Sequence, residues 1–483
     1  MSETTLIIGL PHTCQRLERQ LDLLAERPIT VGWVLVGEEA LATGEMPVRG
    51  HVDELEAIIA QRRPGVALIS LPAVMSDLVT NIRTRLRRLG VPDRFMPTLE
   101  DQLAGVGPRT HLDIDLAALL DRPARRINDQ DVRGVIRGKR VLITGAGGSI
   151  GSELARIVSR YEPEQLILMD RAENVLFEID RQIARRRPDL PRKALLHDVV
   201  DREGTADHCR HLRPEVIFHA AAHKHVPMME DHPGAAVDNN LFGTKSIADA
   251  ADAMGTERFV MISTDKAVNP SSIMGATKRL AELYVQHINQ RSKTAFSMVR
   301  FGNVLGSSGS VLETWSKQIS DGGPVTVTDG RMTRYFMTIP EAAALVIESA
   351  ALVDPKARGG EVFLLDMGEP IRIVDLARRF ISMHGLTPVL PEEARPQNNA
   401  YVPVVFTGIR PGEKLHEELA FDAEAMRATQ HADINLWLLE EPPEEIIGGI
   451  LASLSPSGRS ADPEEVAELI RGLVPEMVRP AAA

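Results

Sequence analysis

Four side chains that can do chemistry follow directly on an apolar run in the middle of the chain. Residues 259–262 have the pattern of a buried strand, and Ser263, Thr264, Asp265 and Lys266 come next. In open α/β sheets, ligands bind beyond the carboxyl ends of the parallel strands. An acid and an amine at such an end are candidates for acid and base catalysis, which requires a raised pKa for the acid and a lowered pKa for the amine. On spacing alone, an exposed turn pair is an equally good interpretation.

A glycine-rich turn between a predicted strand and a predicted helix is the strongest local signal of a bound cofactor. The run 139–144 leads into glycines at 145, 148 and 151, and an apolar helical pattern follows. Such glycines suit a tight turn, a close approach of the backbone to a pyrophosphate, and close packing of the helix on the strand. The helix N-terminus adds unpaired N–H donors. The predicted pyrophosphate site consists of Gly145, Gly148, Ser149, Ile150 and Gly151.

The next predicted strand carries the residues that choose between the two nicotinamide dinucleotides. Residues 166–169 are apolar and are followed by Asp170 and Arg171. A carboxylate at this position bonds the hydroxyls of the adenosine ribose, whereas an arginine can hold a 2′-phosphate. Because the carboxylate comes first at the strand end, we expect NAD rather than NADP. A helix N-cap is the alternative role of Asp170 and is compatible with either cofactor.

Two further predicted strands contribute to the same cofactor site. The strand at 194–199 brings an acid close to the adenine edge, and the strand at 216–222 ends in small residues against which a cofactor can lie flat. A lysine follows, and an asparagine at the start of a later helix can bond back to the strand loops. The cofactor residues predicted from this region are Asp198, Val199, Ala220, Ala221, Ala222, Lys224 and Asn240.

Candidate substrate-binding residues are spread over the second half of the catalytic region. Asn303 ends another predicted strand and can bond a pyrophosphate or a sugar group. Arg334 and Arg410 are cations suited to clamping a diphosphate, and Glu413 can hold the nucleotide ribose and base region. His225 can contact substrate phosphates, although a packed or capping histidine is an equally good interpretation. Each of these residues, taken alone, is more often a surface charge.

Composition excludes several classes of protein. With 483 residues the chain has room for two or three domains, and its net charge of −12 and aromatic content of 4% argue against a nucleic-acid partner. Only Cys14 and Cys209 are present, so we expect a reducing compartment, no disulfide framework and no metal site. There is no signal-peptide pattern and no apolar run that could span a bilayer, so we expect a cytoplasmic protein without a transmembrane segment.

The pattern of apolar and polar residues along the chain predicts two domains, a connector between them and a C-terminal tail. We expect a small structural or regulatory α/β domain at 1–100, a connector at 101–137, a catalytic α/β domain at 138–440 and a C-terminal tail at 441–483. The first domain alternates strand and helix patterns, which indicates a parallel sheet, but its first strand–helix turn is a poor phosphate loop. The connector holds a basic cluster that we expect to be a solvated face, formed by Arg122, Arg125 and Arg126.

Several motifs taken together resemble the extended short-chain dehydrogenase/reductase superfamily. Within it, the chain is similar to the nucleotide-sugar 4,6-dehydratases of the capsular-polysaccharide type, the CapD, PglF and WbpM group. The likeness covers about residues 135–420 and is more specific than a single glycine motif. The N-terminal domain resembles the extra domain of the long-form members. The matching stretches are 145–151, 219–227, 240–244, 263–269, 274–279, 300–307, 333–338 and 410–414.

This resemblance implies a fold and a reaction. The implied fold is a Rossmann-type doubly wound parallel sheet with a smaller α/β substrate-binding cap, preceded by the separate small α/β domain. The implied reaction is 4,6-dehydration of a UDP-N-acetylhexosamine, in which the 4-hydroxyl is oxidised, water is lost across C5 and C6, and hydride returns to C6. We therefore expect a tightly bound, regenerated NAD, with NADP as the alternative, a UDP-sugar substrate, and a homo-oligomer.

The resemblance also assigns roles around the opening motif. Asp265 corresponds to the acid that releases water, Lys266 to the base at C5, and Thr264 to the group that bonds the 4-oxygen. Most short-chain dehydrogenases use a tyrosine to take the hydroxyl proton, but Met274 stands at that position and a thioether is not a base. Lys278, one helical turn later, is expected to bond the nicotinamide ribose. The base for the 4-hydroxyl stays open between Asp265, Lys266 and a relayed water.

Two other functions are compatible with the same motifs. A nucleotide-sugar epimerase of the superfamily would not eliminate water, and Met274 weighs against a C4 epimerase that relies on the tyrosine. A catalytically silent protein that binds NAD or a nucleotide sugar and regulates a glycan-assembly complex would explain Met274 but not the presence of both Asp265 and Lys266.

Overall fold

The computed structural model describes most of the chain and groups it into two compact units. One unit is drawn from residues 1–115, 311–327 and 374–406, and the other from 116–310, 328–373 and 407–483. Two short segments inside the predicted catalytic range 138–440 thus group with the first unit, and the predicted basic cluster of the connector lies outside the described residues. The structure describes residues 4–22, 28–37, 48–72, 75–96, 116–120, 128–353, 360–384, 386–394, 396, 401–420, 426–439 and 442–477.

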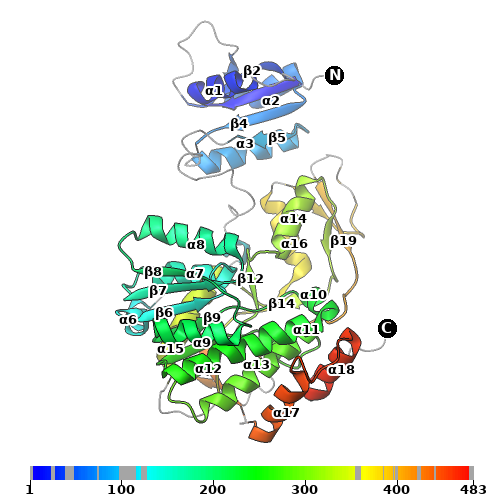
Figure 1. Ribbon diagram of the computed structural model, residues 1–483. Helices are drawn as coiled ribbons and strands as arrows, with labels where there is room; N and C mark the ends of the chain where they lie inside the picture. Colours follow the sequence, from blue (N-terminus) through cyan, green and yellow to red (C-terminus); the bar gives the residue numbers. More distant parts are fainter. Residues whose placement is uncertain are drawn as a thin grey trace. The chain divides into compact units, whose positions relative to one another are not determined.

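The N-terminal part of the first unit is a parallel sheet flanked by helices (Figure 1). The strands pair in the order β3-β2-β1-β4-β5, and every pair is parallel. Apolar side chains form one core cluster with members from α2 and α3 and another with members from α1. The elements are β1 Thr4–Gly9, α1 Pro11–Leu21, β2 Ile29–Leu35, β3 Val48–His51, α2 Leu55–Arg62, β4 Val66–Ser70, α3 Ser76–Arg88 and β5 Asp93–Phe95.

The two later segments of the first unit form a small α/β element. Its strands pair in parallel in the order β13-β19-β18, and the Trp315 indole packs on Phe380 with ring centroids 5.9 Å apart. The indole N–H of Trp315 donates to the carbonyl of Thr326 at 2.7 Å, which ties the helix to the first strand. The elements are α14 Val311–Ser320, β13 Val325–Val327, α16 Ile373–Met383, β18 Thr387–Val389 and β19 Tyr401–Phe406.

A nine-stranded sheet is the framework of the second unit. Its order is β20-β21-β16-β11-β10-β9-β6-β7-β8, with parallel pairing from β16 to β8 and antiparallel pairing at β21. The chain enters the sheet at β6 and extends it in both directions, so the strand order reverses beside β6, where such folds bind ligands. The strands are β6 Arg140–Thr144, β7 Gln165–Asp170, β8 Arg192–Leu196, β9 Val216–His219, β10 Arg258–Ile262, β11 Ala295–Arg300, β16 Gly360–Leu365, β20 Met426–Ala428 and β21 Ile434–Leu439.

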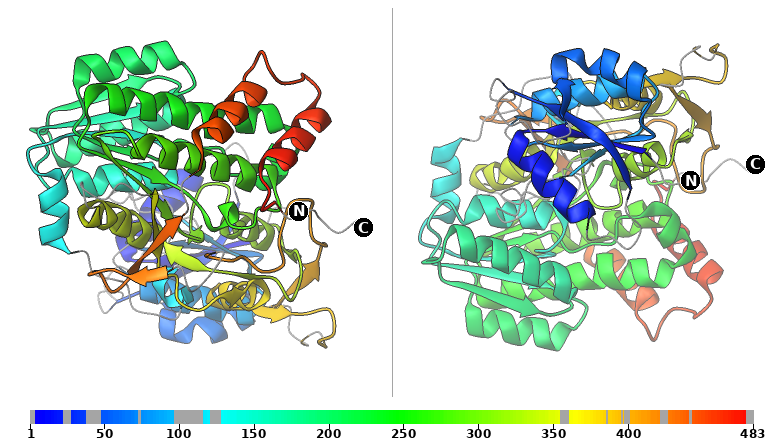
Figure 2. Two further views of the ribbon diagram at one scale, coloured as in Figure 1. Left: turned by 90° about the horizontal axis from the view of Figure 1, so that it is seen from below. Right: turned by 90° about the horizontal axis from the view of Figure 1, so that it is seen from above.

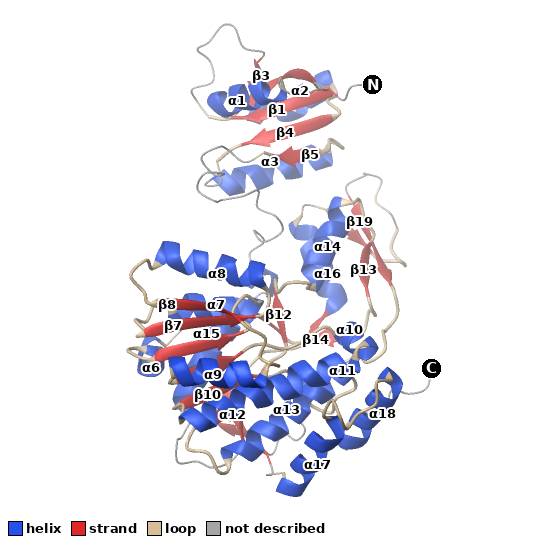
Figure 3. Ribbon diagram, in the orientation of Figure 1, coloured by secondary structure: helices blue, strands red, loops and turns tan. Residues whose placement is uncertain are grey.

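Helices cover both faces of this sheet, as Figures 2 and 3 show. Helices α6, α7, α8 and α15 contribute to one core cluster, and α9, α12 and α13 to the other, which also takes in α17 and α18 of the predicted tail. The predicted doubly wound fold is therefore confirmed. The helices are α6 Asp129–Ile136, α7 Ser149–Val158, α8 Glu173–Arg186, α9 Arg202–Leu212, α12 Thr244–Met254, α13 Ile273–Asn289, α15 Ile339–Leu352, α17 Glu444–Leu454 and α18 Pro463–Leu473.

Short elements connect the sheet to the region where the predicted site residues gather. Among the described residues, no helix has the length and apolar character needed to cross a membrane. The short elements of the second unit are α5 Leu116–Leu120, α10 Val226–Asp231, α11 Pro233–Ala236, a π-helix Val237–Gly243, a 3-10 helix Asp265–Ala267, β12 Asn303–Leu305, β14 Thr333–Arg334, β15 Phe336–Thr338 and β17 Ile371–Arg372.

Candidate active site

The glycine-rich turn has the tight geometry that its sequence predicts. Gly145 has a φ of +64°, and a Cβ there would lie 2.7 Å from the amide nitrogen of Ala221. A Cβ on Gly151 would lie 2.0 Å from the carbonyl oxygen of Gly145, so the first turn of α7 packs directly on the strand end. These contacts leave no room for a side chain, which explains why glycine is needed at both positions.

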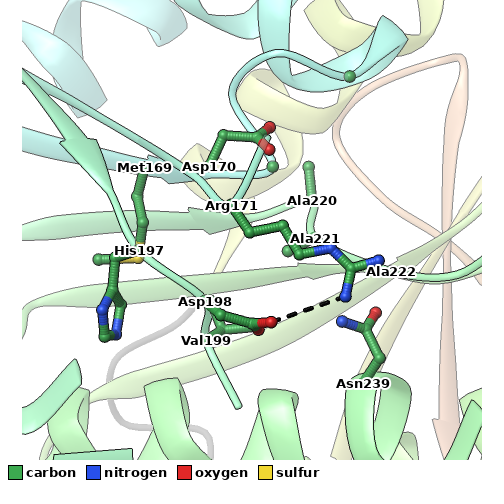
Figure 4. Close-up of a pocket in the computed structure, with 12 residues that line it drawn as sticks. Met169, Asp170, Arg171, His197, Asp198, Val199, Ala220, Ala221, Ala222 and Asn239 are labelled. Atoms are coloured by element: carbon green, nitrogen blue, oxygen red, sulfur yellow. Dashed lines mark ion pairs between the residues drawn. The ribbon is translucent and has the colours of Figure 1, made fainter. Parts of the chain in front are cut away.

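A pocket opens beyond this turn, at the carboxyl ends of β6, β7, β8 and β9 (Figure 4). It brings together most of the cofactor residues expected from the sequence, and it adds Met169, His197 and Asn239, which no motif in the sequence indicates. Ser149, Ile150, Gly151, Lys224 and Asn240 are not among the lining residues. The lining consists of Gly145, Gly148, Met169, Asp170, Arg171, His197, Asp198, Val199, Ala220, Ala221, Ala222 and Asn239.

Charged groups at one end of the pocket determine whether it favours ribose hydroxyls or a 2′-phosphate. The Asp170 carboxylate accepts hydrogen bonds from the amides of Gly147 and Ala172, both at 2.9 Å. The Arg171 guanidinium forms an ion pair with Asp198 at 3.6 Å (Figure 4). The two carboxylates and one guanidinium leave a net negative charge, which disfavours a 2′-phosphate and fits ribose hydroxyls. The glycine cradle and this charge pattern therefore fit NAD.

Two predicted cofactor residues outside the lining hold neighbouring loops in place. Asn240 is buried; its side chain accepts from the His223 amide at 2.8 Å and donates to the Thr277 hydroxyl at 3.1 Å. Lys224 donates to the Ser308 carbonyl at 2.7 Å, and the Ser308 amide donates to the Ser149 hydroxyl at 3.1 Å. The structure thus gives these side chains protein partners.

The acid and the amine at the end of β10 do reach the same side of the strand. Adjacent residues in a strand point to opposite faces, but β10 ends at Ile262 and a 3-10 turn begins at Asp265. Thr264 caps this turn by accepting a hydrogen bond from the Lys266 amide at 3.3 Å. As a result the Lys266 Nζ lies 3.0 Å from Asp265 Oδ1, and the Thr264 hydroxyl donates to the same oxygen at 2.9 Å.

Asp265 is fully buried and uses only part of its hydrogen-bonding capacity. Its side chain has 0% exposure, and Oδ2 is buried without a hydrogen-bond partner in the described structure. A Cβ on Gly302 would lie 3.2 Å from that oxygen, so a side chain at this position would crowd the carboxylate. A buried carboxylate oxygen without a partner is costly unless a ligand supplies one.

Lys266 is surrounded by acceptors. Its Nζ donates to Asp265 Oδ1 and, at 3.1 Å, to Asn303 Oδ1, and it lies 3.7 Å from Glu417 Oε1. Burial lowers the pKa of Lys266, but attraction from the Asp265 and Glu417 carboxylates outweighs burial and Arg334, and the net pKa is raised. The structure therefore does not show the lowered pKa that a lysine base requires.

Met274 and Lys278 both lie on the helix after this turn, but their side chains have different surroundings. Met274 has 3% exposure and belongs to the apolar core on that side of the sheet. Lys278 donates to the carbonyl of Ile262 at 2.7 Å, and burial lowers its pKa to about 8. Tyr284 bonds Lys245 and Asp249 on the side of α12 and does not replace the missing tyrosine.

A second pocket borders Lys266. It unites four predicted residues, Lys266, Asn303, Arg334 and Glu413, while Arg410 and His225 are not part of its lining. Arg410 is instead paired with Glu413 at 2.5 Å, and His225 precedes α10 with its ring close to Gly309. The lining consists of Val226, Lys266, Ser271, Ser272, Asn303, Arg334, Gly412, Glu413, Lys414 and Glu417.

Arg334 is largely engaged with backbone. Its guanidinium donates to the carbonyls of Thr333 at 2.7 Å and Lys414 at 2.8 Å, and its Nε lies 3.6 Å from Glu417 Oε1. Arg334 therefore fixes the loop that carries Glu413 and Lys414, besides presenting positive charge to the pocket. Sequence reasoning missed Glu417, because Glu418 stands beside it and nothing in the pattern tells which of the two is buried.

Comparison with known proteins identifies relatives over most of the chain. Residues 141–437 match the family described as "Polysaccharide biosynthesis protein". The capsular polysaccharide biosynthesis protein CapD of Staphylococcus aureus is 41% identical over 424 residues, which cover 86% of this chain and 68% of that protein. A protein of Campylobacter jejuni named UDP-N-acetylglucosamine 4,6-dehydratase (inverting) is 33% identical over 284 residues, 58% of this chain and 76% of that protein.

One solved structure superposes on much of the chain. The X-ray structure of Pen from Bacillus thuringiensis is 29% identical in sequence and superposes with a TM-score of 0.54. The match covers 64% of this chain and 90% of that chain.

Proposed function

The chain belongs to the polysaccharide biosynthesis protein family, and on that premise we propose that it is a UDP-N-acetylhexosamine 4,6-dehydratase that makes a 4-keto-6-deoxy nucleotide sugar for a bacterial surface glycan. The observation that carries this proposal is the Asp265–Lys266 pair, in which an acid and an amine lie 3.0 Å apart beside a pocket whose charged lining includes Arg334 and Lys414. The capsule-related relative and the relative named as a dehydratase support the same reaction.

The cofactor of the proposed reaction is NAD, held by the glycine turn and by the pocket that contains Asp170. When bound, its nicotinamide supplies the acceptor for the C4 hydride and the donor that returns the hydride to C6. Lys278 lies at the strand end next to this region, where its amine, already bonded to Ile262, is proposed to hold the nicotinamide ribose. The net negative charge around Arg171 favours NAD over NADP.

Asp265 and Thr264 are proposed to handle one proton through two steps. The 4-hydroxyl proton leaves through the Thr264 hydroxyl, which donates to Asp265 Oδ1 at 2.9 Å, and it protonates the Asp265 carboxylate. Asp265 then gives this proton to the C6 hydroxyl as the C6–O bond breaks and water leaves. This assignment provides the 4-hydroxyl base that Met274 cannot provide, and it returns Asp265 to its carboxylate form.

Lys266 is proposed to take the C5 proton. After C4 is oxidised the C5 hydrogen is α to a ketone, so a neutral amine can remove it while the electron pair forms the C5–C6 double bond. The same proton returns to C5 when hydride reaches C6, so a Lys266 that enters the C5 step as a neutral amine is a neutral amine again at the end of the cycle. The diphosphate and uridine are proposed to lie along Arg334, Lys414 and the Arg410–Glu413 pair.

The test is incubation of the purified protein with UDP-N-acetylglucosamine, followed by proton NMR. The proposal expects a new C6 methyl signal together with a 4-keto sugar. An epimerase would give a C4 epimer without a methyl signal, and a silent binding protein would return the substrate unchanged. Either of these results, obtained across the common nucleotide sugars, would refute the dehydratase assignment.

A further inference from the structure

A buried glutamate with no role in the reaction so far lies beside the amine of Lys266. The Glu417 side chain has 3% exposure, and its Oε1 lies 3.7 Å from Lys266 Nζ and 3.6 Å from Arg334 Nε. Its Oε2 is buried and has no hydrogen-bond partner among the described residues. Burying a carboxylate is costly unless it is paired and hydrogen-bonded. A buried glutamate in a ligand pocket with one oxygen that lacks a hydrogen bond is therefore a candidate for contact with a ligand or for a role in proton transfer.

Glu417 lies next to the Lys266 amine, together with Asp265 and Asn303. Lys266 Nζ donates to Asp265 Oδ1 and Asn303 Oδ1, and Glu417 Oε1 lies 3.7 Å away as a further ion-pair partner. The charged groups that face the amine are two carboxylates, Asp265 and Glu417, and one guanidinium, Arg334. Asp265 becomes neutral when it carries the 4-hydroxyl proton, so Glu417 is then the remaining anion next to Lys266.

We propose that Glu417 is a positioning residue for Lys266, which holds the amine against Asn303 and stabilises the ammonium that forms when the amine takes the C5 proton. This inference rests on the proposed dehydration. In the step concerned, the C5–H bond breaks, its proton goes to Lys266 Nζ and its electron pair forms the C5–C6 double bond. The C6–O bond breaks at the same time, and the Asp265 proton leaves with the oxygen as water.

The charge of Glu417 has two opposite consequences for catalysis. It makes the ammonium product of the C5 step more stable, which speeds proton abstraction. It also favours the ammonium in the resting enzyme, so a higher pH is needed before Lys266 is neutral and active. A variant that keeps the shape of the side chain but loses its charge should therefore have a lower plateau value of kcat, and kcat should reach that plateau at a lower pH.

The experiment compares E417Q, E417D and E418Q with wild type in two measurements. Glu418 is a matched control because it is the next residue in the chain, is exposed, and bonds Asn269 instead of the site. The first measurement follows the labelling rate of Lys266 by acetic anhydride against pH, read by mass spectrometry in protein without sugar. The second is the pH profile of kcat on UDP-N-acetylglucosamine.

In E417Q, the labelling midpoint of Lys266 should fall by roughly one pH unit or more, because a full charge at this distance is removed. The acid limb of kcat should move in the same direction, and the plateau should fall at least tenfold. E417D keeps the charge and should keep the raised midpoint, and E418Q should match wild type. An unchanged midpoint and an unchanged acid limb in folded E417Q would overturn the inference.

The two measurements separate this inference from the proposed function. Labelling needs no turnover, so it decides whether Glu417 controls the charge of Lys266 even in a protein that dehydrates no sugar. A wild type without dehydratase activity refutes the proposed reaction and, with it, the catalytic role of Glu417. An active wild type with an unaltered E417Q refutes the inference alone.

Discussion

At the scale of single residues, the central feature is the break of β10 before Asp265. A continuous strand would have pointed Asp265 and Lys266 to opposite faces. The 3-10 turn capped by Thr264 brings their functional atoms to 3.0 Å, and Oδ2 of Asp265 is buried without a hydrogen-bond partner in the described structure. The proposed acid and base therefore depend on a local backbone change that the strand pattern alone does not specify.

Removing either group should stop the proposed elimination while sparing the cofactor. General acid and base groups each contribute roughly 10²- to 10⁴-fold, so D265N and K266M should each lower kcat on UDP-N-acetylglucosamine by about that factor. NAD released from heat-denatured protein should equal the wild-type amount, because neither residue lines the cofactor pocket. K293M, a change at an exposed lysine, is the control. Variants that retain more than a tenth of wild-type kcat would remove these residues from the mechanism.

Lys278 provides a prediction about stability and pH. Its pKa is lowered to about 8 by burial, so the folded state loses the proton near pH 8 while the unfolded state keeps it to about pH 10.5. Below pH 8 the burial penalty is fully present, and it is relieved as the pH rises from 8 toward 10.5. The stability of wild type relative to K278M should therefore increase by roughly 2 kcal/mol between pH 7 and pH 10. Urea unfolding at the two pH values measures this, and a constant difference would show that Lys278 is not buried as a charge.

Sequence reasoning at this scale worked where backbone constraints dictate the residue type. The glycines at 145 and 151 and the carboxylate at 170 fit the geometry of the turn, so their pattern indicates a candidate cofactor site. Glu417 has no such pattern, because its burial arises from contacts with Lys266 and Arg334, which are distant in sequence. The pKa of Lys266 is raised by Asp265 and by Glu417, and only the first of these carboxylates is adjacent to Lys266 in the sequence.

At the scale of elements, the first turn of α7 is fitted to the end of β6 with no spare space. A Cβ on Gly151 would lie 2.0 Å from the Gly145 carbonyl oxygen, which cannot move without displacing the cofactor turn. G151A should therefore lose NAD binding by at least tenfold and destabilise the protein. Equilibrium dialysis with NAD and thermal unfolding measure the two effects.

Gly134 in α6 is the matched control for this element. Apart from its chain neighbours and the backbone of its own helix, nothing in the described structure lies within 4 Å of a Cβ built at this position, and alanine in a helix interior is favoured over glycine by roughly 0.5–1 kcal/mol. G134A should be slightly more stable than wild type and should bind NAD normally. Equal behaviour of G151A and G134A would contradict the tight packing described for α7.

The sequence predicts the fold class of the sheet, but it does not predict which segments belong to which compact unit. Alternating apolar strands and amphipathic helices indicate a parallel α/β fold, and the structure has it. The assignment of segments 311–327 and 374–406 to the first compact unit was not predictable, because it depends on contacts such as that of Trp315 with Phe380. Such contacts join residues that are far apart in the chain and leave no periodic pattern.

At the scale of the whole molecule, each compact unit has its own core and its own buried cysteine. Cys14 lies in the first unit and Cys209 in the second, and burial raises the pKa of each thiol to about 12. Both thiols should therefore be unreactive toward a thiol reagent in the native protein and reactive once the surrounding unit unfolds.

Cofactor binding should protect the two cysteines unequally. NAD is proposed to bind residues of the second unit only, so excess NAD should shift the urea midpoint of Cys209 labelling upward. The midpoint of Cys14 labelling should stay within error. Pulse labelling followed by mass spectrometry of the two peptides gives both values. Equal shifts for the two cysteines would mean that the units unfold as one.

The central claim is that hydride leaves C4 and returns to C6 of the same sugar while water is lost. The most direct measurement uses UDP-N-acetylglucosamine carrying deuterium at C4, with proton NMR and mass spectrometry of the product. The account predicts a 4-keto product whose C6 group is a monodeuterated methyl, CH₂D, with the label retained. Deuterium that returns to C4 in an epimer, or a substrate that remains unchanged, would contradict it.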